Sequence, residues 1–305
     1  MKLRDRLIDP RSPDRRPRRS AYALPTLFTA GNMFLGFYAL IEVFHGAMAT
    51  LQSTADGFLH FQTASLAIGV AVFLDGLDGR IARMTNTVSD FGRELDSLAD
   101  VITFGIAPAV LAFVWGIQFV DLPAGGITLV RLRDAGYTLA FIFLLCGAMR
   151  LARFNIQKNP VPSNPGRPDR KYFVGLPIPS AAAMVTGIIY FDGRPIHGWV
   201  FSAMWLALLG LLSFLMVSTW RYPSFKDLSL TQPRSPMTFV MLGILICGIV
   251  FFSQPVLLFL SASYVLTGIV IRIGGAIRRR LRPGPRNPEP QAGTERPTGA
   301  EHSIG

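Results

Sequence analysis

Four aspartates lie near one another in the sequence, in two pairs separated by a short polar stretch. Asp75 and Asp78 are three residues apart at the end of one apolar segment, and Asp96 and Asp100 are four apart at the start of the next. Side chains three or four residues apart share one face of a helix. Two facing helices would therefore bring the four carboxylates together.

Such a cluster predicts a site for divalent metal ions. Four negative charges in a medium of low dielectric repel one another and would not all stay ionised alone. Carboxylate oxygens without Cys or His select hard ions such as Mg²⁺ or Mn²⁺. Two such ions can hold a pyrophosphate and neutralise charge during an in-line displacement at phosphorus.

The elements that must position these acids are membrane helices. The chain has 305 residues, of which 50% are hydrophobic and 16% are charged, against about 25% charged in a soluble domain. Its mean hydropathy is +0.38. We predict an all-α polytopic membrane bundle of about eight transmembrane helices, the fifth and seventh of which approach the lower limit of ~17 residues for a span. The apolar segments are Leu24–Phe44, Phe61–Leu77, Leu98–Phe119, Ala135–Ala152, Leu176–Phe191, Gly198–Trp220, Met237–Phe252 and Pro255–Ile273.

The two ends of the chain differ in composition from the apolar region between them. We predict a basic, disordered cytoplasmic arm at 1–20 and a transmembrane catalytic domain at 21–277. Residues 278–305 are first basic and then rich in Pro and Gly, which predicts a disordered cytoplasmic tail.

The distribution of Lys and Arg predicts the orientation. Only Arg131, Arg133 and Arg194, of 30 such residues, fall in the connections on one side of the membrane. Because positive residues favour the cytoplasm, both termini and the four acids are expected on the cytoplasmic side. The net charge of +11 is then explained by attraction to anionic lipids, so no nucleic-acid partner is predicted.

The cysteines and histidines indicate no further metal site. Cys146 and Cys247 lie inside apolar runs and are interpreted as packing residues. The histidines fall in connecting segments or in the tail without zinc-like spacing. They are His45, His60, His197 and His302.

The acid-bearing stretch resembles a known enzyme family. Asp75-x2-Asp78-Gly79-x2-Ala82-Arg83-x8-Gly92-x3-Asp96-x3-Asp100 matches every fixed position of the CDP-alcohol phosphatidyltransferase signature. The resemblance implies that the four aspartates surround two divalent cations and that Asp100 is the general base. It also implies that the CDP group is bound at Gly79, Ala82, Arg83 and Gly92. In the implied reaction, an acceptor hydroxyl attacks the lipid-side phosphorus of CDP-diacylglycerol and CMP leaves.

Other stretches are similar to the bacterial phosphatidylserine synthases within that family. They are residues 24–37, 97–108, 150–155, 173–179 and 221–226. Thr26 departs from the asparagine usual after the first proline. The resemblance implies L-serine as acceptor, a homodimer in the bacterial inner membrane, and a six-helix core with two added helices. The alternative keeps the chemistry and uses glycerol 3-phosphate, inositol or a similar alcohol.

Residues near the acids allow two interpretations. Arg150 and Arg153 are three apart at the cytoplasmic end of the fourth apolar segment. They are either contacts for phosphate or for the serine carboxylate or lipid-facing anchors. Asn32 and Asn155 are interpreted as interhelical hydrogen-bond residues, and Glu94 as an ordinary loop acid.

A transporter with carboxylates on its ion path is the alternative from another functional class. It predicts internal repeats or broken helices near the middle of the membrane. The acids are instead expected at one membrane face, which favours the enzyme.

Overall fold

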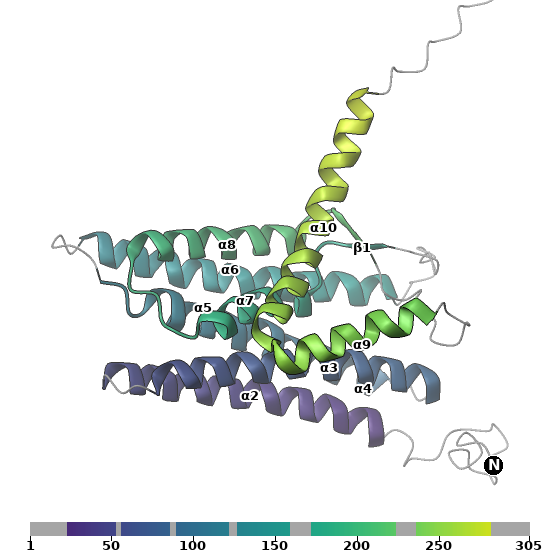
Figure 1. Ribbon diagram of the computed structural model, residues 1–305, viewed down its shortest axis with the longest axis horizontal. Coiled ribbons are helices and arrows are strands. Elements are labelled where there is room, and N and C mark those ends of the chain that lie inside the picture. Colours follow the sequence, from purple (N-terminus) through teal and green to yellow (C-terminus); the bar gives the residue numbers. More distant parts are fainter. Residues whose placement is uncertain are drawn as a thin grey trace, which may run out of the picture.

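The computed structural model describes a bundle of long helices (Figure 1). It covers residues 23–52, 56–85, 90–121, 127–158, 172–223 and 236–281. The predicted arm at 1–20 and residues 282–305 of the predicted tail at 278–305 lie outside the described residues. Residues 278–281, the start of that tail, continue the last helix. The elements are α2 (Ala23–Leu51), α3 (Gly57–Thr85), α4 (Asp90–Asp100), the π-helix η2 (Val101–Ile106), α5 (Ala107–Ile117), α6 (Ile127–Lys158), β1 (Tyr172–Val174), α7 (Ile178–Asp192), α8 (Trp199–Val217), β2 (Arg221–Pro223), α9 (Pro236–Phe251) and α10 (Ser253–Leu281).

The helical membrane bundle predicted from the apolar segments is confirmed. Each of the eight segments coincides with a helix, once α4, η2 and α5 are taken as one rod. Within the described residues, six helices are long and apolar enough to cross a membrane. The two others are α7, with 15 residues, and α9, with 16. At a rise of 1.5 Å per residue they reach about 22–24 Å, less than the ~30 Å of the hydrocarbon core.

The exterior of the bundle is apolar, as contact with lipid requires. Phe34, Phe37 and Phe44 on α2 are 63%, 59% and 62% exposed. Exposed aromatic rings at this density would be unfavourable in water, whereas lipid chains solvate them. Inside the bundle, α2 packs along α3, α3 along α7, and α6 along α8.

The third predicted segment contains a π-helix that begins directly after Asp100. Pro108 stands at the start of α5, where its missing N–H removes one backbone hydrogen bond. The π-helical turn accommodates this irregularity inside a buried rod. Its Thr103 hydroxyl donates a hydrogen bond of 3.0 Å to the Asn32 carbonyl of α2. Gly36 of α2 permits this close approach, because a Cβ there would lie 2.5 Å from Thr103 Oγ1.

Two short strands join segments that are distant in the sequence. Strands β1 and β2 pair antiparallel, with Phe173 opposite Tyr222. The Tyr222 side chain is fully buried, and this burial raises the pKa of its phenol. Its ring lies 5.7 Å from that of Tyr264 on α10. The strand pair thus connects the end of α8 to the last helix.

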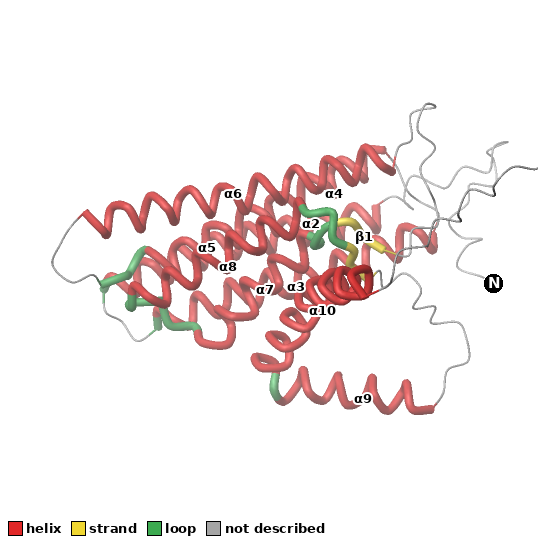
Figure 2. Tube along the Cα trace, turned by 90° about the horizontal axis from the view of Figure 1, so that it is seen from above, coloured by secondary structure: helices red, strands yellow, loops and turns green. Residues whose placement is uncertain are grey.

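The last two helices meet at a sharp bend beside the other helices and point in different directions (Figure 1). Helix α10 packs against α7 and β2, whereas α9 is set apart and meets the bundle through α10 (Figure 2). Gly268 permits the contact with β2, because a Cβ there would overlap the Tyr222 ring.

The first two predicted helices were too short. Helix α2 continues to Leu51 and α3 begins at Gly57, beyond the predicted boundaries at Phe44 and Phe61. His45 and His60 therefore lie within helices and not in a connecting segment, which corrects the sequence interpretation.

Candidate active site

Three of the four predicted acids converge where α3 faces α4. Asp75 lies on α3, and Asp96 and Asp100 lie one turn apart on α4. One carboxylate oxygen from each lies within 4.8 Å of the others, and all three side chains are partly buried. The side chain of the fourth, Asp78, lies outside the described residues, although its backbone continues α3.

This convergence has a direct electrostatic consequence. Three carboxylates at this separation repel one another, and partial burial weakens the screening by water. A divalent cation removes the repulsion, and a donor set of carboxylate oxygens fits a hard ion such as Mg²⁺ or Mn²⁺. The cluster of Asp75, Asp96 and Asp100 can thus hold a metal ion.

A cavity opens beside the acids, between α4 and α6. Asn155 Nδ2 of α6 donates a hydrogen bond of 2.7 Å to Ser97 Oγ of α4. That hydroxyl donates one of 3.0 Å to the Arg93 carbonyl. Asn155 therefore makes the interhelical hydrogen bond expected of it. The cavity is lined by Arg93, Glu94, Asp96, Ser97, Asp100, Leu151, Phe154 and Asn155.

Glu94 was not recognised as a site residue from the sequence. It lies on α4 and lines the cavity, so its interpretation as a loop acid is wrong. Glu94 is two residues from Asp96 and so lies off the helix face that carries the aspartates. The cavity, however, extends around α4 beyond that face.

Arg150 and Arg153, the two arginines predicted near the acids, differ in their surroundings on α6. Arg150 is near enough to Asp100 and Tyr264 to interact with them electrostatically. Its Nε is buried and has no hydrogen-bond partner among the described residues. Arg153 is exposed, and neither of the two arginines is among the residues that line the cavity. Arg150 is thus the arginine of α6 that lies close to the acids.

The positions predicted to bind CDP lie on α3 and α4, the helices that carry the acids. Gly92 lies on α4 one turn before Asp96, so it shares the face that carries the acids. Gly79, Ala82 and Arg83 follow Asp75 in the last turns of α3. Their side chains lie outside the described residues.

Asn32 of α2 is a second residue whose surroundings the sequence did not predict. Its backbone carbonyl receives the Thr103 hydrogen bond, one turn beyond Asp100. Its side chain is fully buried, and neither amide atom has a hydrogen-bond partner among the described residues. A buried amide without partners is costly. Within the described residues, the Asn32 amide therefore does not make the interhelical hydrogen bond predicted for it.

More than half of the sequence matches one family. Residues 22–213 match the CDP-alcohol phosphatidyltransferase family. The chain belongs to this family. The match contains all the acids and ends within α8, so that α9 and α10 of this phosphatidyltransferase lie beyond it.

Individual relatives agree with the family assignment. A CDP-diacylglycerol–serine O-phosphatidyltransferase of Helicobacter pylori is 37% identical over 213 residues, which cover 69% of this chain and 76% of that protein. An enzyme of the same name from Bacillus subtilis is 34% identical over 205 residues, covering 67% of this chain and 91% of its own. One from Saccharomyces cerevisiae is 38% identical over 160 residues, about half of each chain.

Proposed function

We propose that this membrane enzyme transfers the phosphatidyl group of CDP-diacylglycerol to the hydroxyl of L-serine, which gives phosphatidylserine and CMP. The observation that carries the proposal is the convergence of Asp75, Asp96 and Asp100 within the region that matches the family. The names of the relatives indicate the acceptor. CDP-diacylglycerol–serine O-phosphatidyltransferases from two bacteria align with 69% and 67% of this chain.

The charges around the cavity support serine over an acceptor that carries its own phosphate. If Asp96 and Asp100 serve the metal, the remaining charged groups in the lining are Arg93 and Glu94. One positive and one negative group suit the carboxylate and the ammonium of a zwitterion. Glycerol 3-phosphate would bring two negative charges near Glu94 and would need a further cation besides Arg93, for which Arg150 near Asp100 is the candidate.

The metal site is proposed as a pair of divalent ions held by Asp75, Asp78, Asp96 and Asp100. When bound, Mg²⁺ or Mn²⁺ offsets the charge of the diphosphate and of the displaced phosphate group. The fit rests on the donor set, which contains carboxylate oxygens and no softer ligand.

Asp100 is proposed as the general base. It borders the cavity, where its carboxylate can accept the proton of the serine hydroxyl. The serine oxygen then forms a bond to the lipid-side phosphorus, and the bond from that phosphorus to the CMP oxygen breaks. Arg150 places a positive charge near Asp100. It is proposed, with Arg153 as the weaker candidate, to bind phosphate or the serine carboxylate.

The proposal also covers the residues that bind the nucleotide and the side of the membrane on which the site lies. CDP would be bound at Gly79, Ala82, Arg83 and Gly92, where α3 and α4 lead away from the acids. We place this end of the bundle at the cytoplasmic face of the bacterial inner membrane, because the positive connections gather on that side. Both termini then lie in the cytoplasm.

Three further assignments follow from the same resemblance. Residues 21–277 would form the catalytic membrane domain between basic cytoplasmic extensions. The surrounding partners would be anionic lipids, and the assembly a homodimer.

A panel of acceptors tests the proposal. Purified enzyme in detergent is incubated with CDP-diacylglycerol, Mg²⁺ or Mn²⁺, and labelled serine, glycerol 3-phosphate or inositol in parallel. We expect CMP release and labelled lipid with serine alone. Labelled lipid with another acceptor would replace serine and keep the chemistry, whereas no CMP release with any acceptor would reject the enzymatic proposal.

A further inference from the structure

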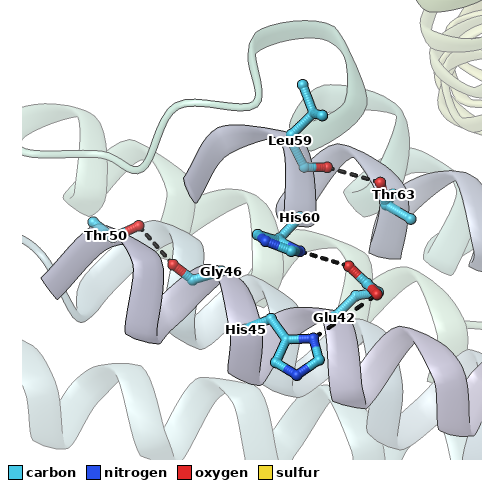
Figure 3. A network of polar contacts seen from close by, with 7 residues as sticks. All are labelled: Glu42, His45, Gly46, Thr50, Leu59, His60 and Thr63. Carbon is cyan, nitrogen blue, oxygen red and sulfur yellow. Dashed lines mark hydrogen bonds and ion pairs between the residues drawn. The ribbon is translucent and has the colours of Figure 1, made fainter. Parts of the chain in front are cut away.

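A second group of metal-ligating side chains lies on the α2–α3 pair, away from the acids. Glu42 and His45 come from α2 and His60 comes from α3, and both imidazole rings point toward the carboxylate (Figure 3). His60 Nδ1 lies 2.8 Å from Glu42 Oε2, and His45 Nδ1 lies 4.0 Å from Glu42 Oε1. One ligand atom from each residue lies within 4.8 Å of the others.

The surroundings make this carboxylate unusual. Glu42 is only 9% exposed and lies in a helix long and apolar enough to cross a membrane. An ionisable side chain in such a position is costly and by default indicates function. The Tyr38 phenol, one turn earlier on α2, lies near enough to Glu42 to interact with it electrostatically. Four polar side chains from two helices therefore meet at one point.

The distances suit a metal ion of the zinc type. In a tetrahedral zinc site with ligand bonds of about 2.0–2.2 Å, neighbouring ligand atoms lie about 3.3 Å apart. The present separations of 2.8 and 4.0 Å lie on either side of that value. The two rings are neighbours, with centroids 5.6 Å apart and planes tilted by 59°. Small side-chain rotations would thus complete the site.

The ligand types separate this group from the acid cluster. Two imidazole nitrogens and one carboxylate oxygen favour Zn²⁺ and neighbouring transition metals, whereas oxygens alone favour Mg²⁺ or Mn²⁺. The two groups are also far apart. Asp75 follows His60 by 15 residues on the same helix, which corresponds to about 22 Å.

We propose that Glu42, His45 and His60 bind one divalent transition-metal ion of the zinc type. Water occupies the remaining coordination position, as in other sites with three protein ligands. The ion fastens α2 to α3 at the end of the pair opposite the acids. The proposal does not depend on the acceptor or on the mechanism of phosphatidyl transfer.

The decisive experiment measures zinc binding to the full chain without a polyhistidine tag. Protein in detergent is saturated with Mg²⁺, so that the acid cluster is filled, and titrated calorimetrically with Zn²⁺. We expect one ion per chain, and a Tm higher by about 3 °C or more when Zn²⁺ is in excess. Co²⁺ in place of Zn²⁺ should give the visible absorption of a cation with nitrogen ligands and low coordination number.

Variants assign the ligands. Glu42→Gln, His45→Gln and His60→Gln should each weaken Zn²⁺ binding by about 100-fold or more, because loss of even an outer partner of a metal ligand costs 10–100-fold. His197→Gln is the matched control. His197 Nδ1 lies 3.5 Å from Asp121 Oδ2, so it also belongs to a histidine–carboxylate pair, but it has no third ligand within the described residues.

His45→Gln keeps the test valid if the other variants fail to fold. The His45 side chain is 52% exposed, so its replacement should leave the fold intact. Absence of stoichiometric Zn²⁺ binding by the wild type would overturn the proposal. Equal binding by wild type and His45→Gln, or equal loss in His197→Gln, would also overturn it.

Discussion

Asn155 on α6 is hydrogen-bonded to Ser97 on α4, with 2.7 Å between the amide nitrogen and the hydroxyl oxygen. Ser97 directly follows Asp96, so this bond fixes the helix that carries two of the three converging acids relative to the opposite wall of the cavity. Bonds of this kind between membrane helices contribute about 0.6 kcal/mol on average, which is small for stability. The main effect of the Asn155–Ser97 bond should therefore be on the position of the acids.

Breaking this bond should lower activity more than stability. We expect Asn155→Ala and Ser97→Ala each to reduce kcat/KM for serine by about 10-fold, because misplacement of reacting groups by ~1 Å can cost about 10²-fold. Thermal unfolding should shift little. The double variant should be no worse than either single one, since both remove the same bond. Additive losses would mean that the residues act separately.

Asp100 and Asp75 should differ in their response to metal. Asp100→Asn removes the proposed base and should reduce CMP release by about 10³-fold at every Mg²⁺ concentration. Asp75→Asn removes only a proposed metal ligand, so it should raise the Mg²⁺ concentration needed for half-maximal activity, with partial recovery at high Mg²⁺. Recovery of Asp100→Asn to the same extent would assign Asp100 to metal binding alone.

Asn32→Leu should make the protein more stable and less active. Leucine has a similar shape and removes a buried amide that has no hydrogen-bond partner among the described residues. Such replacement removes a desolvation cost of about 1–3 kcal/mol, so the Tm should rise. If the amide binds substrate, kcat/KM should fall at the same time. A rise in Tm with unchanged kinetics would limit Asn32 to a structural position.

The contact between α10 and β2 should be sensitive to one methyl group. Gly268→Ala would place a Cβ against the buried Tyr222 ring, and overpacking of this kind costs about 1–3 kcal/mol. We expect a lower Tm and reduced activity, because Tyr264 on α10 lies near Arg150. Gly274→Ala on the same helix is the control. No atom lies within 4 Å of its added Cβ, so the Tm should hold or rise slightly.

The apolar segments and the spacing of the aspartates determined most of what could be predicted. An apolar run in a membrane must satisfy its backbone hydrogen bonds within the segment, and a helix does so. This is why all eight segments coincide with helices. The spacing of four residues placed Asp96 and Asp100 on one face of α4. Their proximity to Asp75 was predicted because the short polar stretch between the two segments brings the end of one helix next to the start of the next.

The parts that were missed depend on helix ends and on tertiary contacts. His45 and His60 each lie one residue outside the predicted apolar segments, and the helices continue through them. An apolar run marks the part of a helix in contact with lipid, not its full length. The pairing of β1 with β2 joins residues about 50 positions apart, and local periodicity carries no signal for such a contact.

The π-helical segment after Asp100 separates α4 from α5. It determines how far one helix is rotated about the common axis relative to the other. One additional residue in that turn rotates everything on one side of it by about 100° relative to a continuous α-helix. Deleting a single residue from Val101–Ile106 would restore regular winding and turn either Asp96 and Asp100 from Asp75 or the buried side of α5 toward lipid. The alignment of the acids thus depends on an irregularity of the backbone as well as on the acids themselves.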